Sequence, residues 1–311
     1  MREAASPNNA RLKYFMSGLL ANAIWGFMAL PLRALTEWSA DTILYFRVFT
    51  SCIFVWLFIF LFRSSKWQRD VVAIQEMPSK KRLRLFFLIF LSSILIIGNW
   101  FTFIYAINNV SIRSAAFAYL VCPLITTLAG YLILKERLTT IKWLSLGLAL
   151  LSVIMLAQTS LVEVIWSVTI ASFYAFYLII QRILGDIDKF NFLAVQALLC
   201  SLIILPLFLI KQNTIPVSPS FWLIISLIAI VFTIIPLFLS MYALKGIASA
   251  TMGVLIYINP VISFAVAIFF FNEIISLNHL MAYSLLIIAI ALYNSSIIYQ
   301  FISKFAKRGR V

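Results

Sequence analysis

Ten long apolar segments, separated by short polar breaks, follow one another along the chain. A helix needs about 20 consecutive apolar residues to cross the hydrocarbon core of a bilayer. The segments are continuous and do not alternate polar with apolar residues as the strands of an outer-membrane barrel would, so helices are favoured. The spans are predicted at about 13–34, 41–62, 85–107, 112–134, 141–158, 162–181, 190–210, 220–243, 250–271 and 279–301.

Composition leads to the same class of protein. Hydrophobic residues make up 64% of the chain and charged residues 11%, and the mean hydropathy is +1.06. Soluble domains carry about 25% charged residues, so no soluble domain is expected. The first span follows a polar start and is too long for a cleaved signal peptide, so it is expected to remain in the protein. The sequence therefore predicts an all-α membrane protein with ten transmembrane helices.

The net charge of +14 reports topology and does not point to nucleic acid. Of the lysines and arginines, twenty fall in the tails and in every second loop, and three (Arg33, Arg113 and Lys211) fall on the opposite side. Basic residues accumulate on the cytoplasmic side of membrane proteins. Both termini are therefore expected in the cytoplasm, with the chain crossing a bacterial inner membrane. The basic loop from Arg63 to Arg84 is expected to lie along the anionic cytoplasmic surface.

One stretch of the chain occurs twice. YLVCPLITTLAGYLILKER contains Pro123 and Glu136, and YINPVISFAVAIFFFNE contains Pro260 and Glu273, with a common offset of 137 residues. The similarity extends upstream, where Tyr105 corresponds to Tyr242. Such self-similarity indicates an internal duplication.

The duplication predicts two five-helix repeats, residues 1–158 and residues 159–311. Because five is odd, the second repeat enters the bilayer in the opposite sense, which is the inverted-repeat arrangement of many secondary transporters. A site between two such halves can open alternately to either side of the membrane.

Three prolines mark the predicted depth of this site. Thirteen residues of helix span about 20 Å, so a proline at that distance from a glutamate at the water boundary lies near the midplane. A proline also frees a backbone carbonyl, and such kinks often border cavities, although they can simply bend a helix for packing. The candidate kinks are Pro123, Pro236 and Pro260. Glu136 and Glu273 are interpreted as helix ends or gates, where they could also cap neighbouring helices or pair with basic residues.

Arg47 is the one basic residue placed inside a predicted span. It lies about 9 Å from the span's end by helical rise, which is costly unless the charge is paired or faces water. Two readings stay open: the side chain extends to the interface, or it faces the cavity and meets an anionic group of a substrate. Side chains at comparable depth that offer hydrogen bonds or ring faces are Asn22, Trp25, Asn99, Trp100, Tyr119, Tyr257 and Asn259.

Several motifs resemble the EamA-type transporters of the drug/metabolite transporter superfamily, and within them the RarD branch. They are AIWGFMALPLRAL from Ala23, ILYFRV from Ile43, NWFTFIYAINN from Asn99, and the two duplicated stretches. The resemblance implies that Trp25, Arg47, Asn99, Trp100, Tyr119 and Tyr257 line a central pocket and that Glu136 closes the fourth span.

The chain departs from the family pattern at two positions. Cys122 precedes Pro123 where the family commonly has Asn-Pro, and Asn259 precedes Pro260 where Gly-Pro is expected. One polar cavity group has thus moved between the repeats, so the identity of a substrate is not carried over.

The favoured function is secondary transport of small amphipathic or zwitterionic metabolites, or drugs that resemble them. No nucleotide-binding loop is present, and the acidic residues fall in tails, loops or span ends, which favours facilitated diffusion or exchange over proton coupling. No cofactor or metal is expected. A non-transporting scaffold or sensor is one alternative, and an intramembrane enzyme is another, although the sole histidine, His279, has no partner at ligand spacing. The expected partners are a small-molecule substrate and the lipid bilayer, with a homodimer left open.

Overall fold

The chain folds into a bundle of helices. A computed structural model describes residues 7–35, 37–109, 112–156, 161–184, 188–211, 215–271, 277–296 and 299, and these residues contain no strand. The helices are α1 (Pro7–Gly26), α2 (Ala29–Arg33), α3 (Ala40–Phe58), η1 (Ile59–Arg63), α4 (Ser64–Gln75), α5 (Ser79–Asn109), α6 (Ile112–Ile133), α7 (Thr140–Leu156), α8 (Leu161–Ile183), α9 (Lys189–Ile210), α10 (Pro219–Ala229), η2 (Ile230–Ile234), α11 (Ile235–Ala243), α12 (Ser249–Leu255), α13 (Ile258–Phe271) and α14 (Leu277–Tyr293).

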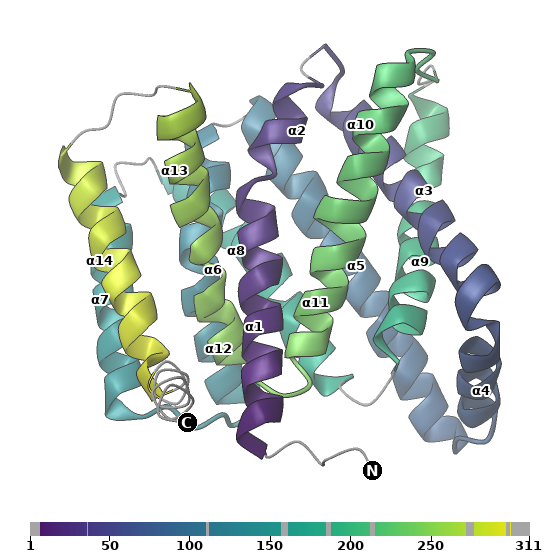
Figure 1. Cartoon of the computed structure of the whole chain (residues 1–311), viewed down its shortest axis with the longest axis horizontal. Helices are drawn as coiled ribbons and strands as arrows, with labels where there is room; N and C mark the ends of the chain where they lie inside the picture. Colours follow the sequence, from purple (N-terminus) through teal and green to yellow (C-terminus); the bar gives the residue numbers. More distant parts are fainter. Residues whose placement is uncertain are drawn as a thin grey trace, which may run out of the picture.

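Helix is present in each of the ten predicted spans. Six helical segments of the described chain are long and apolar enough to cross a membrane, and four shorter apolar helices lie in the remaining predicted spans. Helix α1 begins and α14 ends at the lower end of the bundle in Figure 1, whereas α2 and the start of α10 lie at the upper end. The prediction of an all-α membrane protein is therefore confirmed.

Two of the spans are broken beside a proline. A proline cannot donate to the carbonyl four residues earlier in a helix. At Pro260 the carbonyl of Ile256 accepts instead from the backbone N–H of Asn259 at 3.0 Å. At Pro31 the carbonyl of Phe27 accepts from the N–H of Leu30 at 3.1 Å. In each case the residue before the proline supplies the missing donor, and the helix changes direction there.

Two glycines let these broken spans approach their neighbours closely. A Cβ added to Gly26 would lie 2.6 Å from the Cβ of Ile262, so α1 and α13 meet at a distance that only glycine allows. A Cβ on Gly253 of α12 would lie 2.8 Å from the Cβ of Thr126 on α6. Small residues at such contacts are typical of helices packed within membranes.

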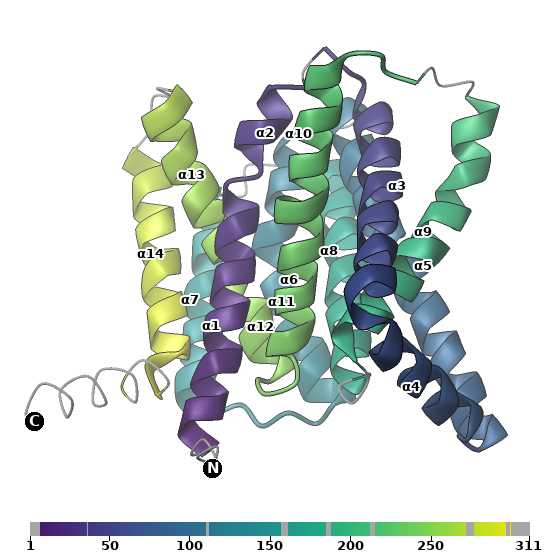
Figure 2. The same cartoon turned by 45° about the vertical axis from the view of Figure 1, so that its right-hand side comes forward.

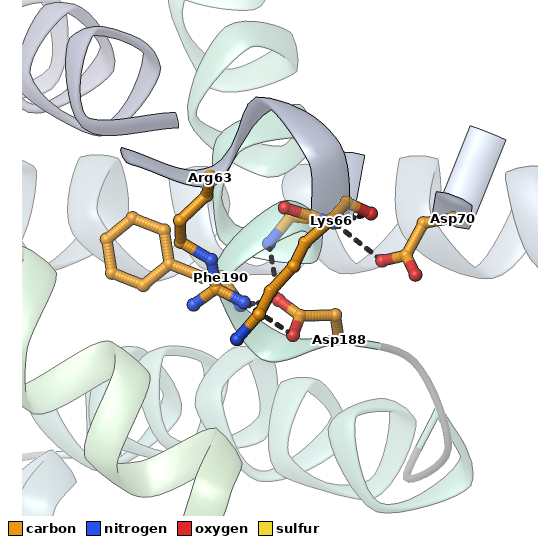
Figure 3. Close-up of polar contacts among 6 residues, drawn as sticks. Arg63, Lys66, Asp70, Asp188 and Phe190 are labelled. Atoms are coloured by element: carbon orange, nitrogen blue, oxygen red, sulfur yellow. Dashed lines mark hydrogen bonds and ion pairs between the residues drawn. The ribbon is translucent and has the colours of Figure 1, made fainter. Parts of the chain in front are cut away.

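A polar cluster joins α4 to the start of α9 at the lower end of the bundle. Arg63 donates to Asp188 at 2.7 Å, and its guanidinium lies 5.3 Å from the centroid of Phe190 (Figure 3). Asp188 also caps α9 by accepting from the backbone N–H groups of Phe190 and Asn191. The amide of Asn191 donates to Asp70 of α4 at 2.6 Å. The basic loop predicted at this end thus contains a helix, and Figure 2 shows α4 and the start of α5 extending away from the bundle.

An ion pair joins α3 and α9 at the other end. Lys211, one residue beyond α9, pairs with Asp41 in the first turn of α3. Its hydrogen bond to this carboxylate raises the pKa of Lys211 above the ordinary value. Both side chains are partly exposed, so the pair is expected to contribute little to stability.

Glu136 caps a helix of the other half of the chain. Its carboxylate accepts from the backbone N–H of Ser249 at 2.7 Å, from the hydroxyl of Ser249 at 2.8 Å, and from the N–H of Ala250 at 2.9 Å. These groups form the start of α12, where a negative charge is favourable. Lys135 has a φ of 54°, a left-handed conformation that turns the chain after α6 so that Glu136 reaches this position. These hydrogen bonds are those of a helix cap, which is one of the roles predicted for Glu136.

Replacing Glu136 with alanine is expected to lower the free energy of unfolding by about 2 kcal/mol, because two backbone donors and one hydroxyl lose a charged acceptor. Thermal unfolding of the solubilised protein measures this loss. Arg137→Ala, at the exposed neighbouring position, is the control and should unfold at the temperature of the unmodified protein. Equal unfolding temperatures for the two variants would contradict the cap.

Candidate functional site

The centre of the site is an irregular turn in the span formed by α10, η2 and α11. The N–H of Ile235 bonds to the carbonyl of Ile230, five residues earlier, so the helix is locally wider than an α-helix. Pro236 follows at once and cannot donate to the carbonyl of Phe232. The indole N–H of Trp25 on α1 donates to this carbonyl at 3.0 Å. Such wide turns occur often at functional sites in other proteins.

The wide turn presents Thr233 to a buried arginine. The hydroxyl of Thr233 donates to the carbonyl of Ile228 at 3.0 Å and accepts from the Nε of Arg47 on α3 at 2.7 Å. The guanidinium carbon of Arg47 lies 4.8 Å from the centroid of the Trp100 ring on α5. Three spans thus meet at this cation, which a ring face and a hydroxyl hold in place.

Arg47 has no acidic partner in the described part of the chain. The ion pairs there join Arg63 with Asp188 and Lys211 with Asp41. A positive charge in an apolar bundle without a counter-charge is costly, and an anionic ligand would offset that cost.

A small pocket lies directly beside Arg47. It is partly open to the outside and lies among α3, α5, α9, η2 and α11. Trp100 and Thr233, which both contact Arg47, line it, together with Ser51 and Gln196. Most of its other walls are apolar, and small-molecule sites likewise combine apolar walls with a few polar groups.

Cys122 of α6 lies in the large apolar cluster, which also contains Tyr174 and Tyr177 of α8. The ring of Tyr174 lies 6.1 Å from Trp25. Trp25, Trp100 and Tyr119 pack against this cluster, whereas Tyr257 belongs to a second cluster with residues of α7 and α14. The departure from Asn to Cys before Pro123 therefore falls in the apolar core.

The predicted site residues are brought together in part. Trp25, Arg47 and Trp100 lie around the wide turn, and Tyr119 packs against the same apolar cluster as the two tryptophans. Asn99 is buried and donates to the backbone carbonyl of Ile170 on α8 at 3.0 Å, so it faces α8. A role for Asn99, Tyr257 or Asn259 in binding stays a prediction.

The predicted kinks and helix ends have the following places. Pro123 lies inside α6, Pro236 is the second residue of α11 after the wide turn, and Pro260 is the third residue of α13 after the break in its span. A role for these prolines at the edge of the cavity stays a prediction. Glu273 lies outside the described residues.

Three polar residues of this region have no place in the predicted site. Thr233 and Gln196 line the pocket, and Tyr174 contacts Trp25. Gln196 could have been predicted from the sequence, because it is an amide in the middle of an apolar span. The sequence indicates Thr233 less clearly, by its place three residues before Pro236. Tyr174 is one of four aromatic residues within five positions, and hydropathy does not show which of them points inward.

The apolar bundle and its pocket with an unpaired arginine define a multi-pass membrane protein of the solute-transporter class. The model of the EamA-like transporter family matches residues 12–158 and again residues 161–295. The chain belongs to this family and is a RarD-like member of it.

Curated bacterial relatives cover nearly the whole chain. An uncharacterized transporter of Pseudomonas aeruginosa, PA0485, is 29% identical over 92% of this chain and 94% of its own length. Protein RarD of Salmonella typhi is 28% identical over 90% of this chain and 94% of its own. The uncharacterized transporter YojE of Bacillus subtilis is 28% identical over 88% and 90%. Two of these three relatives are named as transporters, and none of the names gives a solute.

A solved crystal structure has a similar fold. It superposes with a TM-score of 0.73 over 92% of this chain and 98% of its own, at 16% sequence identity. At this identity the likeness concerns the fold alone.

Trp25→Phe is expected to lower the free energy of unfolding by about 1 kcal/mol, because the Phe232 carbonyl loses its indole donor. In a Pro236→Ala background the same change should cost less, because residue 236 then carries an N–H that can bond to this carbonyl. A double-mutant cycle by denaturant unfolding isolates that difference from the change in packing. An equal loss in both backgrounds would show that Trp25 does not compensate for the proline.

Proposed function

We propose that this protein is a secondary transporter whose ten helices form two inverted five-helix repeats around the pocket. The observation that carries the proposal is that the pocket is lined by matching positions of the two halves. Ile96 and Thr233 are 137 residues apart, and so are Trp100 and Leu237, which is the offset of the duplicated stretch. A pocket on an axis relating two repeats would be lined in this way.

Positions of the second and seventh predicted spans also correspond, but they are separated by more than 137 residues. Val48 and Ala197 are 149 residues apart, as are Ser51 and Cys200, and all four line the pocket. The difference between 149 and 137 is 12, which equals the length of α4, a 12-residue helix between the second and third spans. An extra helix in the first repeat accounts for the change of offset. By the same count, Arg47 corresponds to Gln196.

The contacts between helices support the same correspondence, in which α1, α3 and α5 of the first repeat match α8, α9 and the α10–α11 span of the second. Helix α1 packs on α11, and its counterpart α8 packs on α5. Helix α3 packs on α10, and its counterpart α9 packs on α5. The pairs α3–α9, α6–α12 and α7–α14 each join counterparts. This pattern supports repeats at residues 1–158 and 159–311, and the distribution of lysine and arginine supports cytoplasmic termini.

Alternating access follows from two repeats around one site. Each repeat can adopt the conformation of the other, so the pocket opens first to one side and then to the other. The Glu136 cap holds α12 of the second repeat to the end of the first, and such a contact would have to part when the pocket opens at that end. We place Glu136 in the gate for this reason.

The groups at the pocket suit a small amphipathic or zwitterionic solute, for which the two halves would have to open the pocket further. Arg47 would bind its anionic group, since the guanidinium has no carboxylate partner among the described residues. The rings of Trp25, Trp100 and Tyr119 would contact its apolar part. Exchange or facilitated diffusion is favoured over proton coupling, because the acidic residues fall outside the predicted middle of the spans.

Arg47→Ala is expected to lower flux in proteoliposomes by about tenfold or more, the loss that follows when one charge-assisted hydrogen bond is removed. A panel of small carboxylates, amino acids and uncharged analogues identifies a transported solute first. Arg47→Lys keeps the charge without the planar guanidinium and should recover part of the flux.

Arg137→Ala removes an exposed arginine outside the site and serves as the control, with flux like that of the unmodified protein. Unchanged kinetics of Arg47→Ala would place this side chain at the interface instead of in the site. Absence of flux for every solute would favour a scaffold or sensor.

A further inference from the structure

Helix α8 carries a polar face that the proposed binding site does not use. Tyr174, Tyr177 and Gln181 follow one another at spacings of three and four, so they lie on one face of the helix. Each is at most 5% exposed. Ile170 and Leu178, both 0% exposed, are its apolar neighbours on the same helix. A buried polar face of this kind in an apolar helix needs partners.

One member of this face is satisfied. The hydroxyl of Tyr177 donates to the Oε1 of Gln196 at 3.3 Å, and the Nε2 of Gln196 donates to the hydroxyl of Ser92 at 3.0 Å. Ser92 in turn donates to the carbonyl of Ile89. This chain of hydrogen bonds runs from α8 through α9 to α5, and Gln196 borders the pocket.

The other two members are not satisfied by the described part of the chain. The hydroxyl of Tyr174 and both the Oε1 and the Nε2 of Gln181 are buried and have no hydrogen-bond partner there. Burying an unpaired amide costs several kcal/mol, and hydrocarbon offers no partner. These atoms are therefore expected to bind water or a polar solute.

The face leads from the pocket toward one end of the bundle. Tyr174 contacts Trp25 and stacks on Tyr177 with 5.8 Å between ring centroids. Gln181 lies seven residues further, or about 10 Å along the helix. The next residue, Arg182, donates to the carbonyl of Leu244, just before α12, at the end of the bundle where Glu136 caps that helix.

We infer that this face of α8 is a hydrated path between the pocket and that end, on which Tyr174 and Gln181 bind the polar groups of the passing solute. The inference rests on the proposed function, because it takes the pocket as the binding site. Its ligands are water and then hydroxyl, amide or carboxylate groups, for which an amide and a phenol offer both donors and acceptors.

Cysteine accessibility tests the path without knowledge of a solute. In a chain with Cys52, Cys122 and Cys200 changed to alanine, Gln181→Cys is exposed to a small cationic methanethiosulfonate reagent in vesicles of each orientation. It should react at least about tenfold faster than Leu178→Cys, because only a hydrated thiolate reacts. The faster reaction should come from the side that the Glu136 end faces. If Gln181→Cys does not insert, Tyr174→Cys replaces it, with Ile170→Cys as its control.

Equally slow reaction of both cysteines from both sides would overturn the path. Because labelling needs no transported solute, the two proposals fail separately. Fast labelling of Gln181→Cys without flux of any solute contradicts the transport function alone. Slow labelling together with flux that depends on Arg47 contradicts the path alone.

Discussion

The structure at the centre of this protein depends on a hydrogen-bond donor for one backbone carbonyl, that of Phe232, within a bundle of apolar helices. Pro236 cannot donate to the Phe232 carbonyl, and the helical turn just before it is wider than a turn of α-helix. Trp25, more than 200 residues away in sequence, donates to that carbonyl and ties α1 to the irregular turn. The same turn presents Thr233 to Arg47, which lies over Trp100. This one turn thus connects α1, α3 and α5 at the edge of the pocket.

The two halves of the chain meet around this centre and at the ends of the helices. At the positions that match the wide turn, α5 is a continuous α-helix, and Ile96 takes the place of Thr233. In the proposed repeats Arg47 and Gln196 occupy matching positions, so the two halves would differ in chemistry around the pocket. Such a difference would suit a solute with a charged end and a neutral end.

The spans, the helical class and the duplicated proline and glutamate could be predicted from the sequence, since they follow from hydropathy and spacing. Arg47 was found because a charge in an apolar run is conspicuous. Asn99 shows where this reasoning ends: depth along a helix can be counted, but the face that turns toward α8 is set by packing. The donor from Trp25 and the partners of Glu136 likewise depend on contacts between distant segments, for which neither propensity nor periodicity carries a signal.

The central claim is that the two halves open the pocket alternately at its two ends. Electron–electron distance measurements in nanodiscs test it with one pair of spin labels at each end, at the exposed positions Lys135 and Lys245 near α12 and Glu37 and Ser220 near α2 and α10. The account predicts that a transported solute changes the two distances in opposite directions, so that one pair separates as the other approaches. Two distances that stay fixed, or that lengthen together, would contradict it.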